Sequence, residues 1–478
     1  MRLFELLILF TLLLTLAWPL FPAGVRQDGR LVRLRESLPA LSLILLLPHF
    51  ILEGARWQML LVYLMVILVA GLAAWRRFRP GSAAGKVHST SRLLAAGGLV
   101  LWLLAAALPV LLPVPKLPEP GGPFAVGTFT HHLVDAGRPD PYSEPPNQPR
   151  EIMLQVWYPA PPDASGKTAP YMDRLNIAAP ALAEQLDFPA FFLGHLQLVE
   201  THAIISAPLA STGEALPVLL FSHGLSGFRS QNTIQMESLA SHGYVVVAPD
   251  YTHAAAMTVL PPNRVRLYNN DVVDMSSDAT TIASGKRLVE QWVADLEQIM
   301  GQLEEWNGGG HMLSGRLDLE KAGLFGHSTG AGATLQFCHQ DSRCGAAAFL
   351  DGWFDPASQD ALFTPLEQPI IMVQQVGGFG GESNRVHMRD FFNDAAADVY
   401  RIDVNESTHY DFTDIPMLSP ITSLLGLTGN VPGRRMVTLV DDYTRQFFDQ
   451  SLRGTPAPLL SLANDEYPEV NFYRGSEQ

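Results

Sequence analysis

The sequence predicts an α/β fold, with a mostly parallel sheet and helices on both faces, preceded by a helical transmembrane region. Two observations lead to this prediction. Long apolar stretches follow one another closely within residues 1–115, and about 20 apolar residues allow a helix to cross a bilayer. After residue 115, apolar segments rich in β-branched and aromatic residues alternate with helical segments, which is the pattern of a parallel sheet covered by helices.

We expect four membrane spans in residues 1–115. The second apolar stretch is short and contains Pro39, Pro48 and His49, which favours a tilted or partial span. A cleaved signal peptide is a single such stretch, so the first stretch is expected to be retained. The four stretches are residues 3–21, 38–52, 59–75 and 93–112.

The basic residues of this region predict its orientation. The first loop contains four arginines and the third contains five Lys and Arg, whereas the second has only Arg56. Because short loops rich in Lys and Arg stay in the cytoplasm, the chain after the fourth span is expected to lie outside it. Glu53, Arg56 and Trp57 are interpreted as an interfacial cap, with Trp57 at the headgroups and the charges in water.

The rest of the chain is acidic. It carries 21 Lys and Arg against 43 Asp and Glu, whereas residues 1–115 carry eleven against four. Nucleic acid is excluded as a partner, because binding to phosphates needs a clustered positive surface. Cys338 and Cys344 lack metal-ligand spacing, so no metal and no other cofactor is expected. The two cysteines are either buried thiols or a local disulfide.

A proline-rich linker over residues 116–124 leads to a domain predicted over residues 125–478. Residues 171–198 interrupt the domain with short amphipathic segments, and they are either an ordinary insertion or a lid that meets lipid. The predicted strands are AVGTFTHHLVD, EIMLQVWYPA, LPVLLFSHG, GYVVVAPD, AGLFGHS, AAAFLDG, PIIMVQQVG and DVYRIDV, and the predicted helices are IQMESLASHG, residues 284–303, GAGATLQFCHQ and residues 437–452.

Ser328 lies in the segment GHSTG, residues 326–330, which matches the pattern GxSxG. A match arises by chance in about one in five chains of this length. This one, however, follows an apolar strand and opens a helix, as a nucleophile elbow does. The flanking glycines permit the tight turn that exposes the hydroxyl. The segment therefore indicates an α/β-hydrolase fold with Ser328 as its nucleophile.

His409 follows the last predicted strand, and we interpret it as the general base that activates Ser328. The third member must be a carboxylate that follows a strand and precedes the histidine in the chain. Asp351, at the end of AAAFLD, meets both conditions. The alternative carboxylates are Asp355 and Glu382, and the rival histidines are His223, His253, His311 and His327.

The backbone amides of Leu225 and Thr329 are expected to form an oxyanion hole. Thr329 directly follows the nucleophile, and Leu225 lies in HGLSG after the strand LPVLLFS. Hydrolases of this fold take their two amides from these two places.

Five motifs in order resemble the calcium-independent, secreted-type platelet-activating factor acetylhydrolases, over about residues 122–450. They are FSHGLSGFRS, LASHGYVVVAPD, GHSTGAGAT, CGAAAFLDGW and STHYDFTD. The resemblance implies Ser328, Asp351 and His409 as the triad, with the amides of Leu225 and Thr329 as the oxyanion hole. It also implies metal-independent release of short or oxidised sn-2 acyl chains from phospholipids such as platelet-activating factor. The multi-span N-terminus lies outside the animal pattern.

We therefore expect a membrane-anchored serine esterase, outside the cytoplasm, whose partners are the membrane and a lipid or other ester substrate. Two alternatives stay open. One is a tethered hydrolase of a non-lipid substrate, such as a polyester or a dienelactone-type ester. The other is a non-catalytic membrane sensor that keeps the fold, against which the intact triad and oxyanion motif argue.

Overall fold

The computed structural model describes the chain except for residues 79–88, 186, 396–397, 462–465 and 476–478. The described residues form two compact units, which we call the helical unit and the sheet unit. The last residues of the predicted insertion, Phe191–Leu198, belong to the helical unit. Nothing in the sequence of the insertion indicates this. The helical unit consists of Met1–Pro115, Phe191–Leu198 and Leu418–Pro420, and the sheet unit of Lys116–Ala190, Val199–Met417 and Ile421–Gln478.

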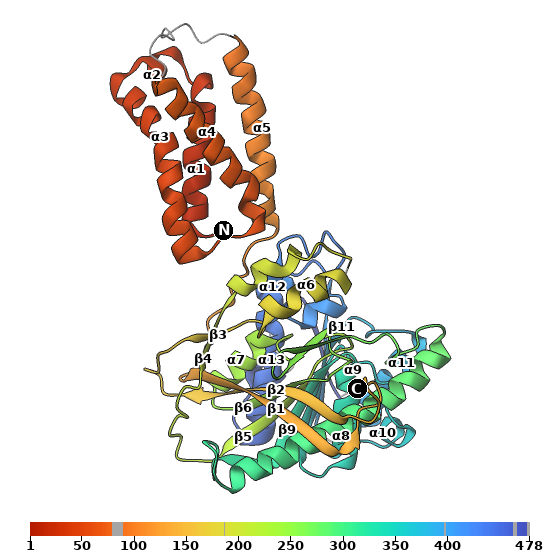
Figure 1. Ribbon diagram of the computed structural model, residues 1–478. Coiled ribbons are helices and arrows are strands. Elements are labelled where there is room, and N and C mark those ends of the chain that lie inside the picture. Colours follow the sequence, from red (N-terminus) through yellow and green to blue (C-terminus); the bar gives the residue numbers. More distant parts are fainter. Residues whose placement is uncertain (79–88, 186, 396–397, 462–465, 476–478) are drawn as a thin grey trace. The chain divides into compact units, whose positions relative to one another are not determined.

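The elements of the helical unit are α1 (Leu3–Ala17), η1 (Trp18–Leu20), α2 (Ala23–Gln27), α3 (Gly29–Pro48), η2 (His49–Glu53), η3 (Trp57–Met59), α4 (Leu60–Phe78), α5 (Ser89–Leu111) and η4 (Phe192–Leu198). Figure 1 shows α1, α3, α4 and α5 running alongside one another. Buried apolar side chains such as Ile8, Leu12 and Val62 fill the space between them. Within the described part of the chain, four helices are long and apolar enough to cross a membrane: Leu3–Leu20, Gly29–Glu53, Trp57–Phe78 and Arg92–Leu111.

The second of these helices is longer than the sequence analysis predicts. It comprises 25 residues, Gly29–Glu53, so the expectation of a short stretch was wrong. The helix begins early because the Asp28 carboxylate accepts hydrogen bonds from the amides of Arg30 and Leu31, at 2.8 and 3.1 Å. Such an N-cap satisfies amides that the first turn leaves free. Pro39 is accommodated inside the helix.

Arg56 is buried, which contradicts the predicted cap with its charges in water. Its guanidinium donates to the two carboxylate oxygens of Glu5 at 2.6 and 2.8 Å, and to the carbonyl of Leu112 at 2.7 Å. A buried charge is tolerated when it is paired and hydrogen-bonded in this way. The indole N–H of Trp57 donates to the carbonyl of Phe192 at 3.0 Å. The loop is therefore packed within the helical unit.

An eleven-stranded sheet forms the centre of the sheet unit. Its strands are β1 (Ala125–Pro139), β2 (Pro149–Ala160), β3 (Thr168–Pro170), β4 (Glu200–Ile205), β5 (Leu216–Ser222), β6 (Val245–Asp250), β9 (Leu317–His327), β10 (Cys344–Leu350), β11 (Ile370–Gln375), β12 (Val399–Val404) and β13 (Val470–Arg474). Among the described residues the order is β13-β12-β11-β10-β9-β5-β6-β2-β1-β4-β3. The strands from β12 to β6 are parallel, and β13 and β2 join them antiparallel at either side.

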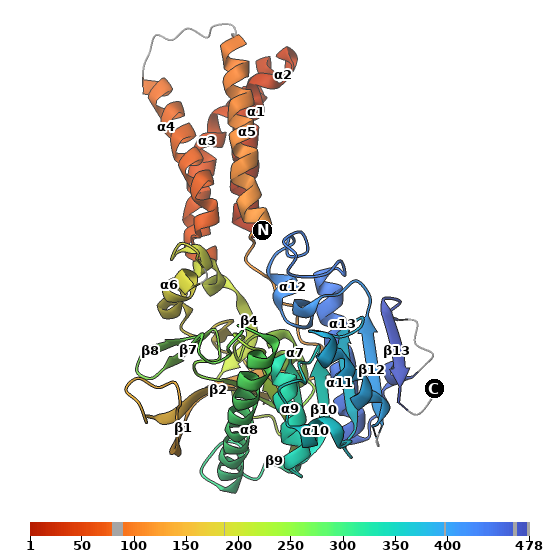
Figure 2. The ribbon, with the colours of Figure 1, turned by 90° about the vertical axis from the view of Figure 1, so that its right-hand side faces the viewer.

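Helices cover both faces of this sheet (Figure 2). On one face, Leu296 of α8 (Asp278–Gly308), Phe337 of α9 (Thr329–Gln340) and Phe391 of α11 (Glu382–Asn393) belong to one buried core. On the other, Leu239 of α7 (Thr233–Ser241) and Phe447 of α13 (Gly433–Arg453) belong to a second. The remaining elements are α6 (Leu175–Gln185), α10 (Gln359–Phe363), α12 (Ile415–Leu418), η5 (His409–Phe412), η6 (Pro458–Leu460) and the hairpin of β7 (Met257–Leu260) and β8 (Arg264–Leu267). The predicted α/β-hydrolase fold is thus confirmed.

The predicted linker and the two cysteines take defined positions. The amide of Gly122 donates to the hydroxyl of Ser241 at 3.0 Å, and the amide of Phe124 donates to the Ser241 carbonyl at 3.1 Å. The end of the linker is therefore hydrogen-bonded to the end of α7.

Cys338 and Cys344 form a disulfide that joins α9 to β10, with their Cα atoms 5.0 Å apart.

Candidate active site

Ser328 occupies the turn between β9 and α9. Its backbone angles are φ 56° and ψ −122°, a strained conformation for a residue other than glycine. A side chain at Gly330 would lie 2.1 Å from the carbonyl oxygen of Ser222, so the close approach of α9 to β5 requires glycine there. The turn has the geometry of a nucleophile elbow.

Asp351 and His409 meet beyond the carboxyl ends of β10 and β12. Oδ2 of Asp351 accepts a hydrogen bond from Nδ1 of His409 at 2.7 Å. The carboxylate also accepts from the backbone amide of Gln375 at 3.1 Å and from its side-chain amide at 2.8 Å. This network assigns the proton of the neutral His409 ring to Nδ1, so Nε2 can accept a proton.

The alternative carboxylates have other surroundings. The side chain of Glu382, at the start of α11, is 78% exposed. Asp355 pairs with Nδ1 of His387 at 2.7 Å. Of the carboxylates that the structure describes, Asp351 is the one in hydrogen-bond contact with the ring of His409.

The four rival histidines each have a partner other than Ser328. The partners are the His409 carbonyl and Gln231 for His327, the Gly224 carbonyl for His223, Asp140 for His253 and Trp306 for His311. His327 is the neighbour of Ser328 in the chain, yet its Nε2 donates to the backbone of His409 at 3.0 Å. It therefore supports the loop of His409 rather than bonding to the serine.

Ser328 and His409 share neighbours at this edge of the sheet. The amide of Ser328 donates to the carbonyl of Leu350, the residue before Asp351, at 3.1 Å. The ring centroids of His327 and His409 are 4.5 Å apart. Within the described residues no hydrogen bond joins the Ser328 hydroxyl to the His409 ring. Such bonds are often long in a free enzyme and shorten in the substrate complex.

Burial sets the protonation states of the pair. Asp351 is fully buried, and burial raises the pKa of its carboxyl to about 6. Burial lowers the pKa of the His409 imidazole below its ordinary value. At pH 7, therefore, the ring of His409 is neutral and can take up a proton while Asp351 is ionised.

The amides of Leu225 and Thr329 lie in two turns that approach each other at Gly224. A Cβ atom at Gly224 would lie 3.1 Å from Cβ of Ser328. None of the described residues accepts a hydrogen bond from either amide, and Thr329 is the first residue of α9, where the helix itself offers no partner. Two such amides beside Ser328 could stabilise an oxyanion if Ser328 is the nucleophile.

Two further residues contact this site and were not predicted from the sequence. Gln375 holds the carboxylate of Asp351 through both of its amides. The ring of Phe379 stacks on that of His409, with centroids 3.6 Å apart and an interplanar angle of 15°. Both belong to QQVGGFGG, at the carboxyl end of a parallel strand. This is where open α/β sheets place their sites, and that position is the signal that could have identified them.

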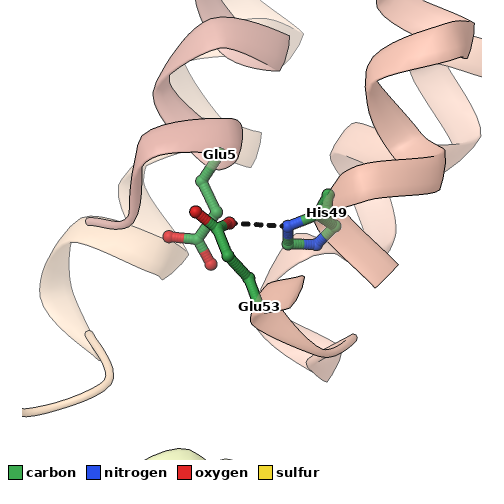
Figure 3. Close-up of side chains that lie close together, drawn as sticks. All are labelled: Glu5, His49 and Glu53. Atoms are coloured by element: carbon green, nitrogen blue, oxygen red, sulfur yellow. Dashed lines mark hydrogen bonds and ion pairs between the residues drawn. The ribbon is translucent and has the colours of Figure 1, made fainter. Parts of the chain in front are cut away.

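Among the described residues, one group of side chains has the spacing of a metal site: Glu5, His49 and Glu53, in the helical unit (Figure 3). Their ligand atoms lie within 4.8 Å of one another. Both oxygens of Glu5, however, accept hydrogen bonds from Arg56, and Glu53 accepts one from Nδ1 of His49 at 2.9 Å. A metal ion would have to displace the arginine, so the group is better described as an ion-pair network.

A family model described as platelet-activating factor acetylhydrolase, isoform II, matches residues 114–453. The chain belongs to this family. The resemblance noted in the five sequence motifs is thereby confirmed at the level of the platelet-activating factor acetylhydrolase family, and the matched region contains Ser328, Asp351 and His409.

The chain is a distant relative of the family's animal and fungal members. Platelet-activating factor acetylhydrolase from Cavia porcellus is 24% identical over 272 residues, which are 53% of this chain and 61% of that protein. A probable 1-alkyl-2-acetylglycerophosphocholine esterase from Arthroderma benhamiae is 23% identical over 418 residues, which are 80% of this chain and 100% of that protein. The chain thus spans less than two thirds of the Cavia porcellus relative.

A solved structure is also similar. Ferulic acid esterase from Streptomyces cinnamoneus aligns with a TM-score of 0.61 and 28% sequence identity. The alignment covers 75% of this chain and 99% of that one. It agrees with the α/β-hydrolase fold of the sheet unit.

Proposed function

We propose that this chain is a membrane-anchored serine esterase that hydrolyses short or oxidised sn-2 acyl esters of phospholipids such as platelet-activating factor. Ser328 is the nucleophile, His409 the general base and Asp351 the residue that orients it. The observation that carries the proposal is the pairing of His409 with Asp351 at 2.7 Å beside a serine in a left-handed turn. A serine held in this way serves acyl transfer and has no use in packing.

The proposed reaction has two acyl-transfer steps. Oγ of Ser328 attacks the ester carbonyl carbon while Nε2 of His409 takes its proton, and the amides of Leu225 and Thr329 stabilise the oxyanion. The tetrahedral intermediate collapses, the bond to the alcohol breaks, and the leaving alcohol receives the proton from His409. Water then attacks the acyl-enzyme with His409 again as base, which releases the acid and restores Ser328.

An exposed apolar surface near His409 supports a lipid substrate. Leu424, Leu425 and Leu427, which we call the apolar rim, are 83%, 61% and 40% exposed. The Thr408 hydroxyl donates to the Leu427 carbonyl at 3.3 Å, which ties the rim to the residue before His409. Clustered exposed apolar residues of this kind mark surfaces that meet lipid or other apolar partners.

The same proposal includes the membrane anchor and the compartment. Four apolar helices of sufficient length support integral attachment. The excess of Lys and Arg in the first and third loops supports a catalytic domain outside the cytoplasm. The disulfide between Cys338 and Cys344 agrees with that location, because such bonds persist in oxidising compartments.

A second candidate is a tethered esterase for a non-lipid substrate. The similarity to a ferulic acid esterase, whose name refers to an aromatic acid ester, favours it. Both candidates share the triad and differ in the acyl group and alcohol that they accept.

An acyl-length series separates the two candidates. p-Nitrophenyl esters from acetate to palmitate are assayed beside phospholipids with an sn-2 acetyl, an sn-2 oxidised or an sn-2 long acyl chain, and beside methyl ferulate. The lipid proposal predicts the highest kcat/KM on the short or oxidised sn-2 phospholipids. A preference for methyl ferulate over every phospholipid would replace it with the second candidate.

A further inference from the structure

The ring of Phe379 lies face to face with that of His409. The centroids are 3.6 Å apart and the planes differ by 15°. Two neutral aromatic rings prefer offset or edge contacts, with centroids about 4.5–7 Å apart. A cation, in contrast, is attracted to the face of an aromatic ring, where the ring quadrupole makes the electrostatic potential negative. The observed overlay therefore suits a protonated imidazolium better than a neutral imidazole.

We propose that Phe379 is a positioning residue that fixes the ring plane of His409 and stabilises the imidazolium formed when His409 takes the proton of Ser328. This inference rests on the proposed function. The positive charge forms only as the proton moves from Oγ to Nε2, so the interaction is stronger in the transition state than in the resting enzyme. An interaction of that kind raises kcat rather than tightening substrate binding.

The segment that carries Phe379 is fixed by its backbone and by one buried side chain. Gly378 and Gly380, on either side of Phe379, have φ angles of 74° and 82°, which other residues adopt at a cost. The side-chain amide of the fully buried Asn384 donates to the Phe379 carbonyl at 2.8 Å and to the Gly352 carbonyl at 2.9 Å. Asn384 thus links the segment of Phe379 to the residue that follows Asp351.

The other groups that face the His409 ring do not duplicate this contact. Asp351 bonds to Nδ1 in the plane of the ring. The ring of His327 is tilted by 31° and that of Tyr410 by 54°. Burial lowers the pKa of His327 to about 3, so it adds no charge at neutral pH. The carboxylate of Asp411 accepts instead from the Thr408 amide at 2.7 Å.

The chain contains a matched comparison. His387 pairs with Asp355 at 2.7 Å, the same distance as in the His409 pair. Its aromatic neighbour is Phe363, which meets the His387 ring at 80°, with centroids 5.7 Å apart. This is an edge contact rather than a face-to-face one. Phe363 therefore offers a control substitution beside an Asp–His pair that the proposed reaction does not use.

The test measures kcat, KM and the pH profile of kcat/KM for the full-length protein with p-nitrophenyl acetate. The variants are Phe379→Leu, Phe379→Tyr and Phe379→Trp, with Phe363→Leu as control. Phe379→Leu keeps an apolar side chain and removes the aromatic face. We expect it to lower kcat by about tenfold with little change in KM, and to move the acid limb to lower pH by about one pH unit. Phe379→Tyr and Phe363→Leu should leave kcat and the position of the acid limb unchanged.

Several outcomes would overturn the inference. One is a loss of kcat in Phe379→Leu without movement of the acid limb, which would indicate a purely structural role. Another is a rise in KM alone, which would make Phe379 a wall of the substrate site. If Phe379→Leu does not fold, Phe379→Trp decides, because a downward shift of its acid limb contradicts stabilisation of the imidazolium. Wild-type protein without esterase activity would instead remove the proposed function itself.

Discussion

Asp351, at the end of β10, accepts a hydrogen bond from His409, and β10 lies next to β9, the strand that leads into the proposed nucleophile Ser328. Many hydrolases place this acid one strand later, and here the later strand, β11, supplies Gln375 and Phe379 instead. The strand after the proposed nucleophile thus carries Asp351, and the next strand leads to the groups that contact Asp351 and His409.

This arrangement predicts unequal effects for two carboxylates. Asp351→Asn should lower kcat by about 10⁴-fold, because an amide favours the wrong tautomer of His409 and does not stabilise the imidazolium. Glu382→Gln is the matched control and should leave kcat within about twofold, since its side chain is exposed. Steady-state kinetics of both variants provides the check, and the reverse order of effects would move the acid to the later strand.

The pair also predicts the pH dependence of activity. The working form needs an ionised Asp351 and a neutral His409, and burial raises the pKa of the Asp351 carboxyl to about 6. As the pH falls through that value, the coupled pair of Asp351 and His409 takes up one proton. Whether the proton resides on Asp351 or on His409, His409 can then no longer act as the general base. Below about pH 6, kcat/KM should therefore fall by about tenfold per pH unit. A profile that stays flat down to about pH 4 would contradict this assignment.

Metal chelators should not inhibit the enzyme. The proposed reaction uses Ser328, His409 and Asp351, none of which needs a cation. In the group of Glu5, His49 and Glu53, both oxygens of Glu5 already accept hydrogen bonds from Arg56. Activity should be equal with and without EDTA, while a calcium-dependent phospholipase in the same buffer serves as the positive control. Loss of activity in EDTA that calcium or zinc restores would show that the reaction needs a metal.

The orientation of the chain is open to direct measurement. Nine Lys and Arg fall in the first and third loops of residues 1–115, which predicts four spans and a catalytic domain outside the cytoplasm. A phosphatase fused after Lys116 should be active, and a reporter that works only in the cytoplasm should be silent at the same position. The opposite pair of results would overturn both the number of spans and the compartment.

The central strands could be predicted from the sequence because their signals are local, and the proposed triad could be named because its members follow chain order. β5, β6 and β10 contain apolar runs, as does the second half of β9, whereas its first half carries Asp318, Glu320 and Lys321 and was not predicted as strand. Ser328, Asp351 and His409 each follow a strand in the order that hydrolases use. Short outer strands such as β3 and β13 were not predicted, because three to five partly exposed residues are too few to show a clear alternation of apolar and polar side chains.

Contacts between distant residues could not be predicted in the same way. Glu5 and Arg56 are 51 positions apart, and nothing in either segment indicates that they form a buried pair. Phe379 lies 30 residues before His409 in a glycine-rich loop, and its stacking depends on the way β11 and η5 meet in the folded sheet. Such pairings follow from tertiary structure alone.

The most direct test of the central claim is to find which residue a fluorophosphonate modifies. These reagents react with a serine that a neighbouring base activates. Labelled full-length protein is digested and the modified peptide is sequenced, in the wild type and in Ser328→Ala. We predict one labelled site, Ser328, with label and esterase activity both lost in the variant, the activity by about 10⁶-fold. Labelling of another serine, or ester turnover retained by a folded Ser328→Ala protein, would contradict the account.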